Sequence, residues 1–147
     1  MARGRTVPSG ARGGAPAGNP SRVPTRGDPD VARSIRRENE AASTLAGRGY
    51  RVEQNPASPP GSTRNPDYRI EGEYFDCYAP RATKSPRGVW SELQGKVDKG
   101  QASRFVLNLD DWRGDLNALR QQFRDWPLAG SQETIVVRNG RAFPLFP

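Results

Sequence analysis

The chain has 147 residues, a net charge of +7 and no histidine. The absence of imidazole excludes a Ser-His-Asp or Cys-His nucleophile, a histidine acid/base pair and an ordinary zinc site. The single cysteine, Cys77, excludes an intrachain disulfide and a cysteine metal cluster, so we expect a domain that works in a reducing cytoplasm, with neither a membrane span nor a signal peptide. Any enzyme chemistry would then depend on carboxylates, lysine and a hard metal ion.

The N-terminal residues 1–27 contain mostly Gly, Pro, Ser, Ala and Arg. Such a segment buries too little apolar surface to offset the entropy of ordering, so we expect a disordered linker that is dispensable for chemistry, followed by one domain over residues 28–147. Residues 1–37 carry 8 Arg and 2 Asp, whereas residues 38–147 carry 15 basic and 14 acidic groups. The high pI of 10.3 therefore reflects a flexible basic arm more than a nucleic-acid-binding surface on the domain.

Residues 29–46 are predicted to form an amphipathic helix. Asp28 can cap the helix, Pro29 suits its first position and a glycine follows at position 47. Glu38 lies in the middle of the apolar stripe, whereas Glu40 lies on the opposite side. An inward glutamate either needs a polar partner or extends its carboxylate to solvent. The apolar stripe contains Val31, Ile35, Ala42 and Leu45.

A tight hairpin is predicted over residues 65–78, because β-rich runs with period-two alternation flank Glu71-Gly72. That turn brings Asp67 opposite Asp76, and opposed like charges are destabilising. A Mg²⁺ or Mn²⁺ ion held by both aspartates would relieve the repulsion. The alternative is a solvated hairpin whose aspartates face water. The predicted register pairs Ile70 with Glu73, Arg69 with Tyr74 and Tyr68 with Phe75.

The loop after this hairpin is basic. It carries Arg81, Lys84 and Arg87, which suit phosphate contacts beside the aspartates or merely keep the surface soluble. Gln101, further along the chain, is another candidate for substrate binding.

Residues 88–99 are predicted to form a second helix, with Val89, Leu93 and Val97 at helical spacing. Lys96 lies on the same stripe, and Lys99 lies well off it. An inward lysine either reaches a polar partner or packs its stem on apolar surface while the ammonium escapes to water.

The remaining elements suggest a core and no chemistry. Residues 50–54 and the apolar run 104–109 are predicted strands, the latter covered on both faces. A closing hairpin over residues 134–145 turns at Asn139-Gly140. The element order predicts an α/β fold, a three-layer sandwich around one mixed β-sheet. A third helix is expected to bury Leu116, Leu119, Phe123 and Trp126.

Taken together, Glu38 on a helix, Pro66-Asp67 opening a strand, Asp76 on the next strand and Lys96 close behind resemble the PD-(D/E)XK nuclease superfamily, which has the restriction-endonuclease-like fold. More narrowly, the chain from about residue 36 to its end resembles the C-terminal tRNA-nuclease toxin domain of CdiA-type contact-dependent growth inhibition proteins. The segments that carry this resemblance are 37–42, 45–46, 49–50, 54–56, 65–68 and 75–80.

The resemblance implies a metal-dependent endoribonuclease that hydrolyses tRNA in the cytoplasm of target bacteria after delivery, with a cognate immunity protein as its partner. It also implies that Glu38, Asp67 and Asp76 hold or order the metal and that Lys96 assists. The lysine usually found two residues after the second aspartate is missing, because Tyr78 stands there. A DNA endonuclease of the same fold and a non-catalytic interaction module remain as alternatives.

Overall fold

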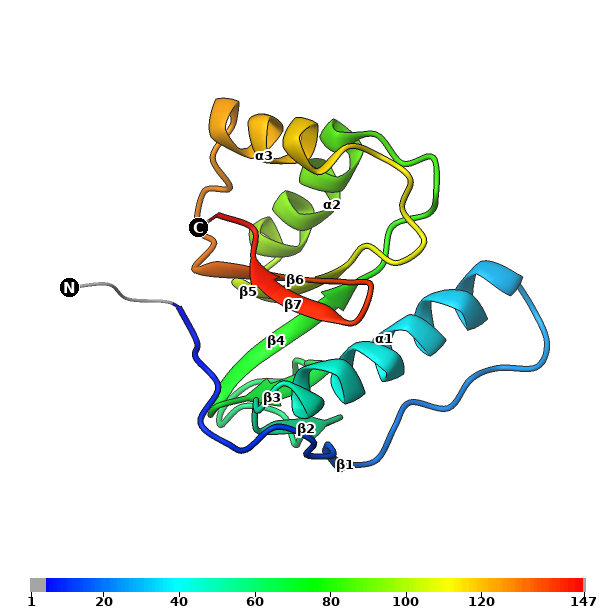
Figure 1. The fold of residues 1–147 in the computed structure, drawn as a ribbon, viewed down its shortest axis with the longest axis vertical. Helices are drawn as coiled ribbons and strands as arrows, with labels where there is room; N and C mark the ends of the chain where they lie inside the picture. The colour runs from blue at the N-terminus through cyan, green and yellow to red at the C-terminus, as the bar shows by residue number, and fades with distance from the viewer. Residues whose placement is uncertain (1–4, 147) are drawn as a thin grey trace.

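A mixed sheet of seven strands lies between one helix on one face and two helices on the other (Figure 1). The computed structural model describes residues 5–146. The predicted α/β sandwich around a mixed sheet is confirmed. In chain order the elements are β1 (Ala17–Gly18), α1 (Pro29–Gly47), β2 (Val52–Gln54), β3 (Tyr68–Ile70), β4 (Glu73–Tyr78), α2 (Pro86–Asp98), β5 (Arg104–Asn108), α3 (Leu116–Asp125), β6 (Glu133–Arg138) and β7 (Arg141–Pro144).

The order of the strands in the sheet follows their order in the chain. The pairs β1–β2, β4–β5 and β5–β6 are parallel, and the other three neighbouring pairs are antiparallel. Helices α2 and α3 form the crossovers of the two parallel pairs in the second half, which places both on the same face. In the described part of the chain, no helix has the length and apolar character needed to cross a bilayer.

Alternate residues of the central strands supply two cores on opposite faces of the sheet. Val106 packs on the α1 side, and its neighbours Phe105 and Leu107 pack on the α2 and α3 side. This period of two follows from the strand geometry and agrees with the apolar sequence of β5. The prediction of a strand covered on both faces is confirmed.

Helix α1 begins and ends close to the predicted limits. The Asp28 carboxylate accepts a hydrogen bond from the Asp30 N–H, and Pro29 stands in the first turn. Ala42 and Leu45 are fully buried. Val31 was predicted in the apolar stripe but is 47% exposed, because it lies in the first turn, outside the group of α1 residues that packs into the core.

The hairpin of β3 and β4 has the predicted turn and register. Glu71 and Gly72 have φ values of 49° and 84°, and Tyr68 pairs with Phe75. The ladder stops there, one residue short of Asp67 and Asp76. The two aspartates are therefore not a ladder pair as predicted; instead, the Asp67 carboxylate accepts a hydrogen bond from the backbone N–H of Cys77 at 2.7 Å.

The second half of the chain contains two deviations from prediction. Helix α2 begins at Pro86, before the predicted residue 88, because Ser85 caps it by accepting the Gly88 N–H. Trp126 was predicted in the core but is 43% exposed, since α3 ends at Asp125 and Trp126 has left the helical conformation. The closing hairpin turns at Asn139-Gly140 as predicted, with both residues at positive φ.

The segment predicted as a linker is described over residues 5–27, where it makes backbone and side-chain contacts with the domain. Ala17–Gly18 add a short strand beside β2, and the segment then passes to the start of α1 (Figure 1). Composition does not reveal this, because the contacts are made by backbone groups and small polar side chains rather than by apolar burial. Residues 1–4 of the predicted linker and Pro147 of the predicted domain lie outside the described residues.

Candidate active site

Three carboxylates and one ammonium meet between the two outer layers. Glu38 comes from α1, Asp67 from the residue before β3, Asp76 from β4 and Lys96 from α2. The charge on Glu38 raises the pKa of Asp67, the charge on Asp67 raises that of Asp76, and Lys96 lowers both. Such mutual effects require proximity, so the fold brings together the four residues that the sequence singled out.

The two aspartates are poor acids for their type. Desolvation is the main reason that the pKa of Asp67 and that of Asp76 both rise to about 6, and neighbouring carboxylate charge adds to it. Asp76 is only 7% exposed. A further cation, Arg64, acts on Asp76 in the opposite direction. Buried carboxylates that repel one another are a costly arrangement unless a cation completes it.

Glu38 and Glu40 have different surroundings, as helical phase predicted. Desolvation raises the pKa of Glu38, and the charge on Asp76 acts in the same direction, while a hydrogen bond from Ser21 opposes both. Glu40 is exposed and accepts a hydrogen bond from Arg37 at 3.0 Å. Only the first of the two glutamates therefore belongs to the acidic cluster.

A cleft of about 750 Å³ opens between α1 and α2 beside this cluster. Glu38 and Lys96 line it from opposite layers, with Cys77 and Tyr78 of β4 between them. The lining also includes three further cationic residues, Arg33, Arg81 and Lys84. Asp30 and Glu92 share this lining, 3.2 Å from Arg81 and 4.0 Å from Lys84. The cleft thus combines a carboxylate cluster with a rim of mixed charge, whose cations suit contacts with a phosphodiester backbone.

The candidate substrate-binding residues are placed differently from one another. Arg81 and Lys84 line the cleft, and Gln101 lines a second hollow of about 480 Å³ that also contains Lys84 and Lys96. Arg87 lines neither hollow, because its guanidinium stacks on the ring of Trp126 at 4.6 Å. The structure therefore brings Arg81 and Lys84 to the cleft, leaves Gln101 in the neighbouring hollow and directs Arg87 to an aromatic neighbour.

The donor set fits a hard divalent cation held by few protein ligands. Within residues 5–146, no three carboxylate or thiol groups are arranged to enclose a metal ion. Mg²⁺ is commonly held by one or two carboxylates, with water and substrate oxygens completing its shell. Asp67 and Asp76, whose charges repel in a desolvated place, are the two carboxylates with that chemistry.

The environment of Cys77 disfavours the ionised form of its thiol. Burial raises the pKa of its thiol, so the thiolate needed for attack is not formed near neutral pH. Since the chain has no histidine either, the site has neither a thiolate nor an imidazole nucleophile.

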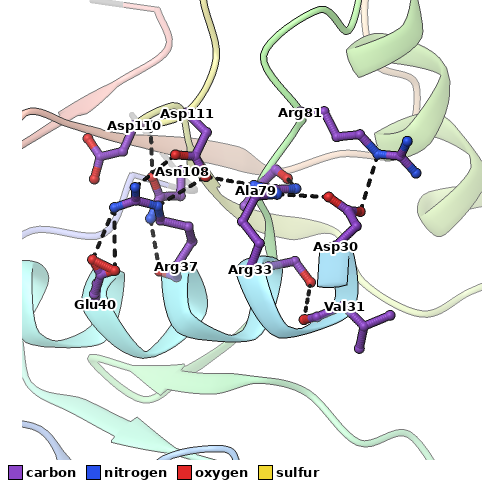
Figure 2. A network of polar contacts seen from close by, with 11 residues as sticks. Asp30, Val31, Arg33, Arg37, Glu40, Ala79, Arg81, Asn108, Asp110 and Asp111 are labelled. Carbon is purple, nitrogen blue, oxygen red and sulfur yellow. Dashed lines mark hydrogen bonds and ion pairs between the residues drawn. The ribbon is translucent and has the colours of Figure 1, made fainter. Parts of the chain in front are cut away.

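A polar network holds the first half of α1 in place (Figure 2). The Asp111 carboxylate accepts hydrogen bonds from Arg33 Nη1 and Arg37 Nη2, both at 2.8 Å. Arg33 Nη2 also donates to the carbonyl of Ala79 at 2.8 Å, at the end of β4. Asn108, only 1% exposed, donates to the Arg37 carbonyl at 2.8 Å. These bonds fix the helix turn that precedes Glu38.

Sequence reasoning missed three residues at this site. Arg64 lies between the predicted strand 50–54 and the predicted hairpin 65–78, and Ser21 lies in the predicted linker; no pattern distinguishes either residue. Asn108 carried a usable signal, because it is the one polar residue between the apolar residues of the run 105–109. A buried polar side chain in such a strand normally has a specific partner.

Three comparisons relate the chain to known proteins. A family model described as the contact-dependent growth inhibition CdiA C-terminal domain matches residues 64–143. A protein of Burkholderia pseudomallei strain 1026b named tRNA nuclease CdiA-2 is 40% identical over 124 residues, which make up 84% of this chain and 4% of that protein. The chain thus spans only a small part of this relative.

The solved structure of a CdiA-CT/CdiI toxin and immunity complex from Burkholderia pseudomallei superposes with a TM-score of 0.82 at 38% identity. The match covers 91% of this chain and 100% of the other. The family model includes the positions of Asp67, Asp76 and Lys96, and Glu38 precedes its first matched residue.

Proposed function

Because the chain belongs to the family of the contact-dependent growth inhibition CdiA C-terminal domain, we propose that it is a metal-dependent endoribonuclease that hydrolyses tRNA in target bacteria. A cognate immunity protein would neutralise it, as the matched toxin and immunity complex suggests. On this proposal the toxin acts in the cytoplasm of the target cell, where tRNA is found.

One observation carries the proposal beyond family membership. Glu38, Asp67 and Asp76 gather with Lys96 beside a cleft that is also lined by Arg81 and Lys84. A metal-dependent nuclease needs carboxylates for the cation, a group beside the attacking water and positive charge for the polynucleotide backbone. The cleft has a candidate for each need.

We further place the fold in the PD-(D/E)XK superfamily. Support comes from the order of the four residues along α1, β3, β4 and α2. The departure is Tyr78, which stands where the superfamily usually has lysine. Lys96 would replace that lysine from the next helix, and its place in the lining of the same cleft as Tyr78 supports the replacement.

The chain's own residues would divide the work as follows. Asp67 and Asp76 would hold Mg²⁺ or Mn²⁺, which supplies Lewis-acid polarisation of the scissile phosphate when bound. Lys96 would orient the attacking water or neutralise charge that develops on the phosphate. Arg81 and Lys84 would hold the neighbouring phosphates. The expected reaction is hydrolysis without a covalent intermediate.

Incubation of the purified protein with total tRNA and with plasmid DNA, with Mg²⁺, with Mn²⁺ and with EDTA, tests the proposal. We expect metal-dependent cleavage of tRNA, and we expect the plasmid to remain intact. Cleavage of plasmid alone would identify a DNA endonuclease, and activity that survives EDTA would overturn the metal requirement. If neither substrate is cut with Mg²⁺ or with Mn²⁺, the nuclease proposal fails and a binding module becomes the better interpretation.

Two matched pairs of variants test the site itself. Lys96→Ala and Glu38→Gln should each lower kcat by about a hundredfold or more, since each removes a group at the reacting centre. Lys99→Ala and Glu40→Gln should leave kcat within about twofold, because both side chains are exposed and outside the acidic cluster. The reverse pattern would show that Lys99 and Glu40 serve the site instead.

A further inference from the structure

Asparagine side chains hold residues 19–21 against α1. The Ser21 N–H donates to Asn39 Oδ1, and Asn39 Nδ2 donates back to the Ser21 carbonyl, both at 2.9 Å. Asn55 Nδ2 donates to the carbonyl of Asn19 at 2.7 Å. The pairing of β1 with β2 lies directly upstream. A segment held by both its backbone donor and its backbone acceptors has a defined position.

The asparagine that holds Ser21 is itself fixed. Gln54, which is only 5% exposed, donates from Nε2 to Asn39 Oδ1 at 3.0 Å. Asn39 lies on α1 directly after Glu38, so this anchor and the acidic cluster share one turn of helix. The segment therefore docks beside the candidate active site and not on a remote surface.

This docking directs the Ser21 hydroxyl at the candidate active site. Its Oγ donates to Glu38 Oε2 at 2.5 Å, a charge-assisted bond to the carboxylate. Asn55 Nδ2 donates to the same Oγ at 3.1 Å and so occupies one of its acceptor positions. A hydroxyl has one proton to donate, and the short bond to Glu38 uses it.

Asp67 is a second side-chain hydrogen-bond partner of the Glu38 carboxyl group, and two further contacts hold the Glu38 backbone. Tyr68 Oη donates to the Glu38 carbonyl at 2.5 Å, and Asn108 donates to the carbonyl one residue earlier. Neither contact fixes the rotation of the glutamate side chain, which has three flexible torsions. In the described part of the chain, Ser21 is the residue whose hydroxyl donates to this carboxylate.

We propose that Ser21 is a positioning residue of the nuclease, holding the Glu38 carboxylate in its working orientation from a segment that has the composition of a linker. The inference rests on the proposed function, since Glu38 matters to catalysis only if the cluster is a nuclease site. Residues 19–21 are then a structural part of the active site.

The test compares Ser21→Ala and Ser21→Thr with Ser9→Ala on tRNA as substrate. Ser9 is the matched control, because it lies in the same segment and its Oγ donates to Glu71 at 2.6 Å, outside the acidic cluster. We expect Ser21→Ala to lower kcat by about 10- to 100-fold, the usual cost of losing a group that orients an active-site carboxylate. KM and the unfolding midpoint should remain near those of the wild type.

Rescue separates positioning from a structural role. Ser21→Thr keeps the hydroxyl and should recover most of kcat, and Ser9→Ala should match the wild type. In a Glu38→Gln background, Ser21→Ala should have little further effect, because the two residues act as one unit. Wild-type kcat in Ser21→Ala, or a threonine variant as slow as the alanine variant, would overturn the inference while leaving the nuclease proposal intact. A wild-type protein that does not cleave tRNA would instead overturn the proposed function.

Discussion

The ionised forms of two carboxyl groups in the cluster, those of Asp67 and Asp76, destabilise the folded protein. Asp67 and Asp76 both have a pKa near 6 for the same two reasons, desolvation and the charge of a neighbouring acid. A folded-state pKa above the unfolded value means that the folded protein binds its proton more tightly. Each protonated aspartate therefore contributes to the stability of the folded state. This contribution is complete below the unfolded pKa and is lost as the pH rises through the folded pKa. The metal-free protein should therefore lose stability between about pH 4 and pH 7.

The substitution Asp76→Asn should separate stability from activity. It removes one of the mutually repelling charges, so the metal-free variant should be more stable than the wild type at pH 8 and its stability should depend less on pH. Cleavage of tRNA should be abolished. Urea unfolding in EDTA across this pH range, with a cleavage assay in Mg²⁺, measures both effects.

Asp125→Asn is the matched control for that experiment. The Asp125 side chain is exposed and accepts a hydrogen bond from Gln121, so the stability profile of the variant should follow that of the wild type. A clear loss of stability in metal-free Asp76→Asn at pH 8 would show that the aspartates do not repel one another as described.

At the scale of elements, one carboxylate fastens α1 to the loop after β5. The Asp111 carboxylate pairs with both Arg33 and Arg37, and the guanidinium of Arg33 also donates to the Ala79 carbonyl at the end of β4 (Figure 2). The hydrogen bond from Arg37 is the first reason that the pKa of Asp111 is lowered. Such a group stabilises the fold at neutral pH, and this contribution is lost as the pH falls through its folded value.

The substitution Asp111→Ala should destabilise the protein by about 1–2 kcal/mol, because it leaves two partly buried arginines without their shared acceptor. Urea unfolding at pH 7 measures the change. Glu40→Gln is the control, since it removes only the exposed partner of Arg37 and should change stability by less than about 0.5 kcal/mol. Equal effects of the two substitutions would show that Asp111 does not join the elements.

At the scale of the whole molecule, the N-terminal segment joins distant parts of the fold. Thr6 donates from its backbone to Glu133 of β6, Ser9 donates to Glu71 in the β3–β4 turn, and Ser21 reaches α1. Only the last of these contacts touches the candidate active site. The early and late parts of the segment should therefore have separable effects.

Two truncations distinguish these effects. Removal of residues 1–15 should lower the unfolding midpoint while leaving kcat near the full-length value, because β1 and the docked residues 19–21 remain. Removal of residues 1–22 should lower kcat at least as much as Ser21→Ala does. Full activity of the second truncation at saturating tRNA would instead support the prediction that the segment is dispensable for chemistry.

The sequence by itself determined the features that depend on local patterns. The register of the β3–β4 hairpin followed from Glu71-Gly72, and a side chain's position on a helix distinguished Glu38 from Glu40. These predictions succeeded because turn conformation and helical periodicity are set by residues a few positions apart. The strand β5 was predictable for the same reason, as a short apolar run.

Only the tertiary structure decided which distant residues meet. Ser21 had no distinguishing sequence context, because its partners Asn39 and Asn55 lie on other elements and bond to its backbone and hydroxyl. In the sequence, Arg87 and Arg81 are equivalent candidates for phosphate contacts. In the structure, Arg87 differs because its guanidinium stacks on the ring of the exposed Trp126. Contacts of this kind join residues that are distant in the sequence. They are set by the tertiary fold, and composition and local periodicity do not predict them.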